Sequence, residues 1–362
     1  MKTLLLVGGA RAGVDLFQSL LDNHEQILQF PGVIYINDDL KKILSNKSKK
    51  KVAQTFIKKY SSFFDSRKSY EERHYMLGAK KNKHYKINKK KFVQRFLNFS
   101  KNDTLFEKND LFQNLYLLHK AYDFDYEKKE KKLLVINVHI LPFAVNFKSF
   151  FKNIDHEIIH TIRHPLSSLS SSIKNWLTYK NGIYMNSKEL FYNLDLIFFG
   201  IQKLKKLNKK LYIVQLEKLH LNTNNVMKSF CKIYNLKFLS SLKKSTYQNL
   251  MWWGDAISGK DLNGINKKFK IIYDLEMFTR SDLYFINSLM EKQLKKYNYE
   301  MVVSKKQFFH FMPLKCELII WKNIINKKQI KNVLLIPYFY LKRVLFFNNF
   351  YFKKVELPKS IL

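Results

Sequence analysis

Residues 3–15 read TLLLVGGARAGVD and carry the clearest structural pattern of the chain. After Thr3, four consecutive apolar residues are typical of a buried strand in a parallel sheet, and this apolar run stops at Gly8 and Gly9. After Gly13, apolar side chains recur at the spacing of one helix face until Asp22 ends the pattern. The positions on this face are Val14, Phe17, Leu20 and Leu21. The stretch therefore predicts a strand, a glycine-rich loop and a helix.

Three later segments continue this alternation. Residues 133–140, 158–162 and 211–216 are short apolar runs that are typical of buried strands. Pro165 suits the first turn of a helix after the second of these runs, and Thr223 suits the N-cap of another helix. Strands that alternate with helices predict an α/β fold, a three-layer sandwich in which helices flank a central parallel sheet.

Two parts of the chain depart from this alternation. Residues 35–130 are rich in lysine and aromatic residues, with Gly78 as their one glycine, and we interpret them as a helical insertion within a domain of residues 1–300. Residues 301–362 then form a C-terminal extension. Within it, residues 333–350 mix aromatic and basic side chains. This segment could lie on a membrane surface, or it could be a terminal helix or strand packed on the core.

The composition restricts the class of protein. With 362 residues, of which 46% are hydrophobic and 15% aromatic, the chain can bury a large core. The net charge of +36 favours an anionic partner, but seven of the 65 basic residues are arginines, and the lysine excess is also what drift in an AT-rich genome would produce. Attraction to anionic substrates or membranes is the alternative to such drift, and nucleic acid is the less favoured partner.

The same composition excludes several other classes. The apolar runs are too short to cross a bilayer, and Cys231 and Cys316 form no CxxC pair, which excludes a disulfide scaffold and a thiolate zinc site. We expect a cytoplasmic protein, with association with a membrane as an alternative, and no metal in the site.

The glycine-rich loop predicts a binding site for an anion. A loop between a strand and a helix directs backbone N–H groups at a bound phosphate. Gly8 and Gly13 have the spacing of a Walker loop, but Val14 and Asp15 replace the Lys-Ser pair that binds phosphates and Mg²⁺. A P-loop kinase therefore lacks its main parts. The loop keeps one positive charge, Arg11, and arginine is the cation whose planar fork suits a phosphate.

A second motif follows the predicted strand 158–162. Arg163 leaves the end of that strand, where open parallel sheets bind ligands, and Ser171 lies about two helical turns further on. The guanidinium and the hydroxyl could share one phosphate group. Taken singly, Ser171 is one of several neighbouring serines and also suits a solvated helix position.

Together the two motifs resemble the sulfotransferases that use 3′-phosphoadenosine 5′-phosphosulfate (PAPS). The first is similar to the family's 5′-phosphosulfate-binding turn G-x-x-R-S-G-T-T, here Gly8, Gly9, Ala10, Arg11, Ala12, Gly13, Val14 and Asp15. Arg163 and Ser171 resemble the family's 3′-phosphate-binding pair. The resemblance implies a P-loop-like fold, PAPS as cofactor, and sulfuryl transfer to a hydroxyl of a glycan, a lipid-linked sugar or a small metabolite. Residues 35–130 would shape the acceptor side.

Other segments extend the resemblance to about residue 299. Residues 212–219 (YIVQLEKL) are similar to the family's strand ending in Y-E-D-L, and the stretch that begins with Trp252 stands where members place a loop over the cofactor. Lys260 in that stretch, with Lys267 and Lys268 nearby, is a candidate for holding the 3′-phosphate.

One departure concerns the cofactor loop. Val14 and Asp15 stand where the family has two threonines, and the carboxylate would repel a sulfate unless it turns away as a helix cap. Backbone N–H groups would then do most of the holding.

The resemblance also suggests a general base. His139, in the segment VHILP, resembles the catalytic histidine of the family's T-H-L-P segment, with one residue inserted, and an imidazole can accept a proton near neutral pH. Glu107 and Asp110 remain alternatives, and His139 could instead be a hydrogen-bonded strand end. The rival from another class is a basic peripheral protein of the same fold that binds anionic lipid or nucleic acid without catalysis.

Overall fold

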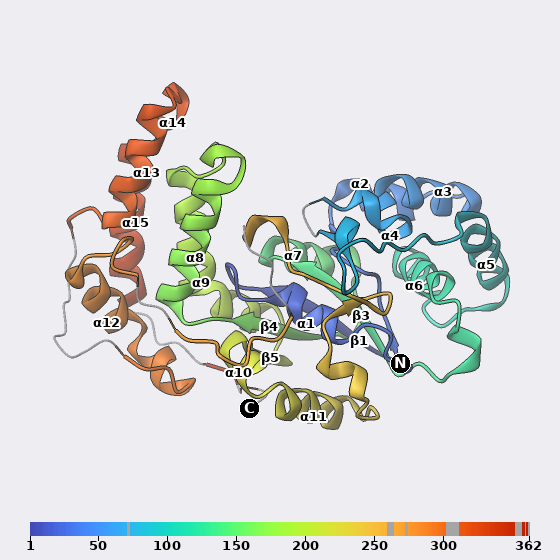
Figure 1. The fold of residues 1–362 in the computed structure, drawn as a ribbon. Coiled ribbons are helices and arrows are strands. Elements are labelled where there is room, and N and C mark those ends of the chain that lie inside the picture. Colours follow the sequence, from blue (N-terminus) through green and yellow to red (C-terminus); the bar gives the residue numbers. More distant parts are fainter. Residues whose placement is uncertain are drawn as a thin grey trace.

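The computed structural model describes residues 1–70, 73–258, 264–271, 274–301, 311–351, 357, 358 and 360. Its centre is a five-stranded sheet with the order β2-β3-β1-β4-β5, and all neighbouring strands are parallel (Figure 1). The strands are β1 (Lys2–Gly8), β2 (Ile27–Leu28), β3 (Leu133–His139), β4 (Glu157–Ile162) and β5 (Leu211–Gln215). The four strands predicted from sequence are confirmed. The short edge strand β2 was not predicted, because two residues leave no periodic pattern.

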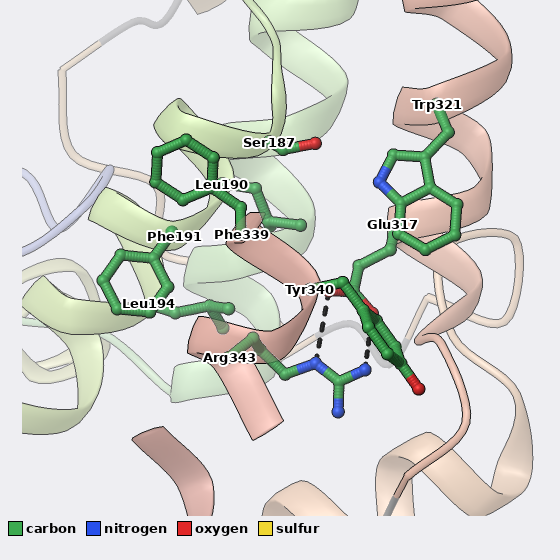
Figure 2. Close-up of a pocket in the computed structure, with 9 residues that line it drawn as sticks. All are labelled: Ser187, Leu190, Phe191, Leu194, Glu317, Trp321, Phe339, Tyr340 and Arg343. Carbon is green, nitrogen blue, oxygen red and sulfur yellow. Dashed lines mark hydrogen bonds and ion pairs between the residues drawn. The ribbon is translucent and has the colours of Figure 1, made fainter. Parts of the chain in front are cut away.

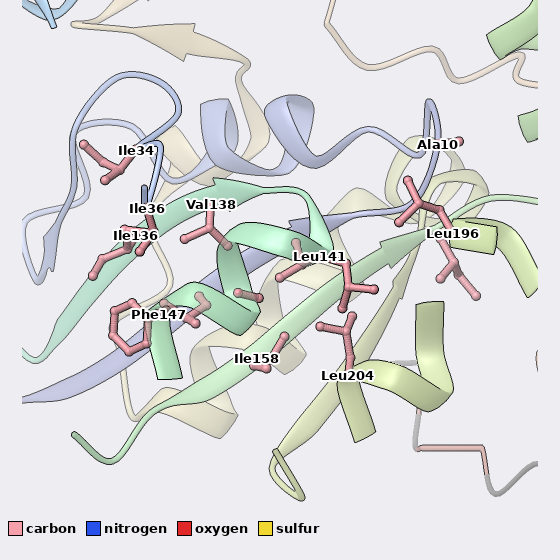
Figure 3. Close-up of a cluster of buried hydrophobic side chains, with 14 of the residues drawn as sticks. Ala10, Ile34, Ile36, Ile136, Val138, Leu141, Phe147, Ile158, Leu196 and Leu204 are labelled. Atoms are coloured by element: carbon pink, nitrogen blue, oxygen red, sulfur yellow. The ribbon is translucent and has the colours of Figure 1, made fainter. Parts of the chain in front are cut away.

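Helices cover both faces of the sheet, which confirms the predicted α/β fold. Along β1, Leu4 and Leu6 pack in one core cluster, whereas Leu5 and Val7 pack in the other, as alternation along a strand requires. The first cluster holds α1 (Val14–Leu20), α10 (Leu216–Leu221) and α11 (Thr223–Tyr234). The second holds α7 (Leu141–Phe150), α8 (Pro165–Thr178) and α9 (Ser187–Leu207), and Figure 3 shows part of it around Ile136, Val138 and Ile158.

The insertion is helical, as predicted. Its helices are α2 (Asp38–Leu44), α3 (Lys49–Lys59), α4 (Ser61–Phe64), α5 (Lys89–Asn102) and α6 (Asp110–Tyr122). They lie to one side of the sheet, at the right of Figure 1. Aromatic residues from three of these helices pack around Phe30, which lies just before the insertion: its ring contacts those of Phe56, Phe63 and Tyr122, and all four side chains are buried.

The C-terminal part is helical too. It contains α12 (Arg280–Lys296), α13 (Lys315–Asn326), α14 (Ile330–Leu334) and α15 (Ile336–Tyr351). Phe346 and Phe347 of α15 pack on Phe191 and Phe198 of α9, so one face of the terminal segment joins the core. None of the helices in the described part of the chain is long and apolar enough to span a membrane.

Short elements complete the structure. They are η1 (Ser66–Lys68), η2 (His74–Met76), η3 (Tyr126–Lys128), η4 (Tyr179–Gly182), η5 (Ser240–Lys243), η6 (Ala256–Ser258) and the hairpin β6 (Thr246–Tyr247) and β7 (Leu250–Met251). One sequence-based detail was wrong. Thr223 is the first residue of α11 rather than its cap, because its hydroxyl donates a hydrogen bond to the carbonyl oxygen of Leu219 instead of accepting one from the helix.

Candidate active site

Three segments that carry predicted site residues meet at one edge of the sheet. Since β3, β1 and β4 are parallel neighbours, their carboxyl ends lie side by side. The glycine-rich loop leaves β1, Arg163 directly follows β4, and His139 is the last residue of β3. The N–H of Gly9 donates a hydrogen bond to the carbonyl oxygen of Thr161, 2.9 Å away, and thus joins the loop to β4.

The loop is too tightly packed for side chains at two of its glycines. Gly13 has a φ of 77°, and a Cβ there would overlap with Cδ1 of Leu216. A Cβ on Gly8 would lie 2.9 Å from Cγ1 of Val14. Arg11 also has a positive φ, 51°, which an L residue adopts only when its surroundings impose it. The loop is therefore a fixed turn at the start of α1.

Arg11 is held by a segment that comes much later in the chain. Its Nη1 lies 3.1 Å from Oδ2 of Asp255, and both side chains are largely buried. Asp255 belongs to the stretch beginning at Trp252 that was expected to cover the cofactor. Trp253 in the same stretch donates a hydrogen bond from Nε1 to the carbonyl oxygen of Gly78, 2.8 Å away. This stretch therefore connects the loop side of the sheet to the insertion.

Arg163 combines burial with unused hydrogen-bonding capacity. Its Nε is buried and has no hydrogen-bond partner among the described residues, and its guanidinium carbon lies 5.6 Å from the centre of the Phe269 ring. Burial lowers the pKa of Arg163, and the charge of Arg11 adds to this effect, while the Glu217 carboxylate opposes it. The two arginines are thus close enough to repel each other.

Glu217 fixes the backbone beside Arg163. Its carboxylate accepts hydrogen bonds from the N–H of His164, at 2.8 Å, and from the hydroxyl of Tyr299, at 2.9 Å. Burial raises the pKa of this carboxyl above its usual range. Glu217 therefore acts as a buried support for the end of β4, a role that the motif YIVQLEKL did not reveal.

The serine-rich face of α8 lies against the loop. The hydroxyl of Ser168 donates a hydrogen bond to the carbonyl oxygen of Ala10. Ser171 lies three residues further along, on the same side of the helix, is partly buried, and accepts a hydrogen bond from Nδ2 of Asn175 at 3.4 Å. The structure thus places Ser171 one turn beyond a serine that contacts the loop.

Asp15 turns toward β3. Its Oδ1 lies 3.3 Å from Nδ1 of His139 and 3.1 Å from Nδ2 of Asn137. Asn137 in turn donates to Oε1 of Gln18 at 2.7 Å. Burial raises the pKa of the Asp15 carboxyl, but the His139 imidazole and the hydrogen bonds outweigh this effect, so the net pKa is below its usual range. The Asp15 carboxylate therefore turns toward His139 and does not act as a helix cap, because the N-cap position is Gly13 and Asp15 lies inside α1.

His139 ends β3 with a φ of 61°, and its side chain is 40% exposed. The N–H of His139 donates to Oδ1 of Asn137, at 3.0 Å, which helps to hold the backbone in this left-handed conformation. One ring nitrogen thus faces a largely buried carboxylate, while the ring keeps access to solvent. Sequence reasoning found His139 but missed Asn137 and Gln18, which are polar residues inside apolar runs.

The alternative bases lie elsewhere. Glu107 lies just before α6, Asp110 is the first residue of α6, and both are exposed. The neighbouring Asn109 donates a hydrogen bond to the carbonyl oxygen of Lys152, just beyond the end of α7. Since α7 starts beside His139 and its ten residues extend for about 15 Å, this region is far from the strand ends.

The lysine candidates for the 3′-phosphate stay predictions. Lys260 lies outside the described residues, and Lys267 and Lys268 are exposed. Within the described ranges, no three His, Cys, Asp or Glu side chains are grouped so that they could hold a metal ion.

Among the comparisons with known proteins, only the comparison with solved structures found similar chains. No family model matches the chain. No curated protein matches it. The sulfotransferase domain from the curacin biosynthetic pathway is 14% identical, with 83% of this chain and 99% of that one covered and a TM-score of 0.43. The sulfotransferase domain from the Synechococcus PCC 7002 olefin synthase is 11% identical, with 85% and 90% covered and a TM-score of 0.41.

A third similar structure is the sulfotransferase STF9 from Mycobacterium avium, which is 10% identical, with 83% of this chain and 78% of that one covered and a TM-score of 0.40. At these identities and scores, the likenesses carry no argument about function. The functional assignment rests on the residues at the strand ends.

Proposed function

We propose that the protein is a sulfotransferase that takes the sulfuryl group of PAPS and transfers it to a hydroxyl acceptor. The observation that carries this proposal is the position of Arg11 and Arg163 at the ends of adjacent strands, with the Nε of Arg163 buried and without a described partner. A buried polar group without a partner is costly, and two neighbouring guanidinium groups add repulsion. A ligand with two anionic groups would relieve both costs.

The residues at the site suit such a ligand. The loop of residues 8–13 would hold the 5′-phosphosulfate through backbone N–H groups and Arg11, and Arg163 with Ser171 would hold the 3′-phosphate. The ring of Phe269 lies against a face of the Arg163 guanidinium, which leaves the N–H groups at its edge for a phosphate. Val14 offers no hydroxyl and Asp15 faces His139, so the 5′ end would be held by the backbone and Arg11.

When bound, PAPS supplies the sulfuryl group and leaves as the bisphosphate. The residues of this chain then have three tasks. Arg11 neutralises negative charge that develops on the leaving phosphate. His139 accepts the proton of the acceptor hydroxyl at Nε2. Asp15, acting as a positioning residue, holds Nδ1 so that the basic nitrogen faces outward.

The acceptor would be a hydroxyl of a glycan, a lipid-linked sugar or a small metabolite. The insertion stands next to the end of β3 and would form the acceptor side. Tyr35 supports this position, since it is 45% exposed and its ring centre lies 5.6 Å from that of Phe143 in α7, the helix that follows His139. An exposed aromatic ring at this place could stack on a sugar.

The experiment is an incubation of the full chain with sulfate-labelled PAPS and an extract of its host. We expect label in an acceptor with the wild-type protein and none with His139→Ala. The matched control is His84→Ala, which changes an exposed histidine of the insertion and should keep full transfer. Binding of the bisphosphate without any transfer would favour a non-catalytic protein, and label transfer by His139→Ala would reassign the base.

A further inference from the structure

The C-terminal helices present one buried face and one exposed face. Figure 2 shows the buried face, where Arg343 of α15 meets Glu317 of α13 next to residues of α9. Nε and Nη2 of Arg343 lie 3.2 and 2.9 Å from the two carboxylate oxygens, and the arginine side chain is 1% exposed. This paired charge and the neighbouring aromatic rings fix the rotation of α15 about its axis.

The opposite face of α14 and α15 is an exposed apolar stripe. It consists of Ile330, Leu334, Tyr338, Leu341 and Leu345, whose exposed fractions lie between 55% and 75%. The spacing of four, four, three and four residues places all five on one side of the helices. Leu335 between α14 and α15 keeps helical dihedral angles and its carbonyl oxygen accepts from the N–H of Phe339, so the stripe continues across the junction.

Lysines border this stripe. Lys331 and Lys342 each follow a stripe residue and are exposed, which puts them along one edge of it. The Nζ of Lys342 lies 5.5 Å from the centre of the Tyr338 ring. Residues 318–351 contain five lysines and no aspartate or glutamate. The only arginine of this range, Arg343, is neutralised by Glu317, so the lysines determine the charge of the surface.

A second exposed segment lies near the end of α13. Nδ2 of Asn323 donates to the carbonyl oxygen of Gly182 at 3.1 Å, which ties α13 to the connection between α8 and α9. In that connection Ile183 and Tyr184 are 52% and 48% exposed. Figure 1 shows the ends of α8 and α13 beside each other, away from the insertion. Apolar and basic side chains therefore gather at this end of the molecule.

We infer that the stripe is a docking surface for a bilayer that contains anionic phospholipid. An interfacial helix buries an apolar face among the acyl chains and keeps lysines at the level of the headgroups. The stripe and its lysine border have this arrangement. A second copy of the chain fits less well, because two such surfaces in contact would bring lysines of equal charge together. The inference does not depend on the proposed transfer reaction.

The test is co-sedimentation of the full chain with vesicles, either of phosphatidylcholine alone or of phosphatidylcholine and phosphatidylserine in equal amounts. A protein of this net charge adsorbs on anionic surfaces generally, so the variants must separate apolar insertion from charge. Leu334→Ser with Leu341→Ser leaves the charge unchanged, and we expect it to weaken binding to the mixed vesicles at least about tenfold.

The control is Leu105→Ser with Leu275→Ser, two leucines outside the stripe that are 53% and 55% exposed. We expect this variant to bind like the wild type. Similarly, Lys331→Gln with Lys342→Gln should weaken binding more than Lys89→Gln with Lys90→Gln on α5. Equal effects of the stripe and control variants, or no binding by the wild type, would overturn the inference.

The same variants distinguish self-association. Light scattering after size exclusion should give the same mass for the wild type and for Leu334→Ser with Leu341→Ser in the absence of lipid. A wild-type dimer that this double variant converts to a monomer would show that a second copy covers the stripe, and would contradict membrane docking.

Discussion

The imidazole of His139 and the carboxylate of Asp15 are in contact, with 3.3 Å between Nδ1 and Oδ1. The contact joins the end of β3 to the first turn of α1. A carboxylate accepts hydrogen bonds, so the proton lies on Nδ1 and Nε2 is the basic atom of the ring. The same contact turns the Asp15 charge toward the imidazole, which lessens the repulsion that a phosphosulfate would meet.

The variant Asp15→Asn should show whether Asp15 mainly orients the His139 imidazole or mainly repels the bound nucleotide. The amide cannot stabilise a charged imidazole, so we expect kcat to fall about ten- to a hundredfold while affinity for adenosine 3′,5′-bisphosphate changes little. Steady-state kinetics and a pH profile would measure the first effect and calorimetry the second. A variant that binds the bisphosphate more tightly at unchanged kcat would mean that repulsion is the main effect of Asp15.

Asp15 also predicts a change of stability with pH. Its pKa is lowered in the folded state, so the ionised carboxylate stabilises the fold above its unfolded value of about 3.8, and this contribution is lost as the pH falls through the folded value. Wild type and Asp15→Asn should therefore differ in unfolding free energy at neutral pH and converge in acid. A difference that does not change with pH would exclude the charge of the Asp15 carboxylate as its cause.

Buried histidines should make the whole fold acid-sensitive. Burial lowers the pKa of His160 to about 4, and similar values hold for His119, His164 and His220. Since the unfolded chain binds protons from about pH 6.5 downward, unfolding free energy should fall between pH 6.5 and 4, by at most about 1.4 kcal/mol per pH unit for each histidine. His160→Asn should reduce this slope and the exposed His84→Asn should not. Stability that is flat over this range would refute the expectation.

The two loop glycines provide a matched pair. In Gly13→Ala an L residue must adopt a φ of 77°, and its Cβ presses against the side chain of Leu216. We expect this variant to lose about 2–4 kcal/mol of unfolding free energy. In Gly9→Ala the added Cβ would lie 3.3 Å from the carbonyl oxygen of Thr161, and Gly9 has no positive φ. We therefore expect this variant to lose about 1 kcal/mol of unfolding free energy. Chemical denaturation would measure both. A larger loss for Gly9→Ala would mean that the turn has another conformation.

Asp255 competes with an anionic ligand for Arg11. Asp255→Asn removes a carboxylate 3.1 Å from the guanidinium, so we expect the bisphosphate to bind about two- to tenfold more tightly. Titration calorimetry at two salt concentrations would test this. Weaker binding would instead show that Asp255 is needed to position Arg11.

The sequence predicted those parts of the protein whose patterns are local. A run of leucines before Gly8 and a helical stripe after Gly13 identify a strand, loop and helix, because each pattern reflects the burial of consecutive residues. The partners of the site residues were not predictable in this way. Asp15 and His139 are 124 positions apart and meet because β1 and β3 are neighbours in the sheet. Arg11 and Asp255 are 244 positions apart and meet because the stretch that follows β7 packs against the loop.

For the terminal segment, residues 333–350, the sequence pattern was also insufficient to predict the structure. Its aromatic and basic residues suggested either a packed element or a membrane surface, and α15 has a face suited to each. The sequence could not separate these faces, because Arg343 is buried by its pair with Glu317 while Lys342, its neighbour, is exposed.

Binding of adenosine 3′,5′-bisphosphate, measured by titration calorimetry, tests the central claim most directly. We predict that the wild type binds it with or without Mg²⁺, and that Arg163→Met, which keeps the apolar contact with Phe269, loses at least about tenfold in affinity. The exposed Arg280→Met should bind like the wild type. Absence of binding by the wild type, or equal affinity of Arg163→Met, would contradict the claim that the ends of β1 and β4 hold this nucleotide together.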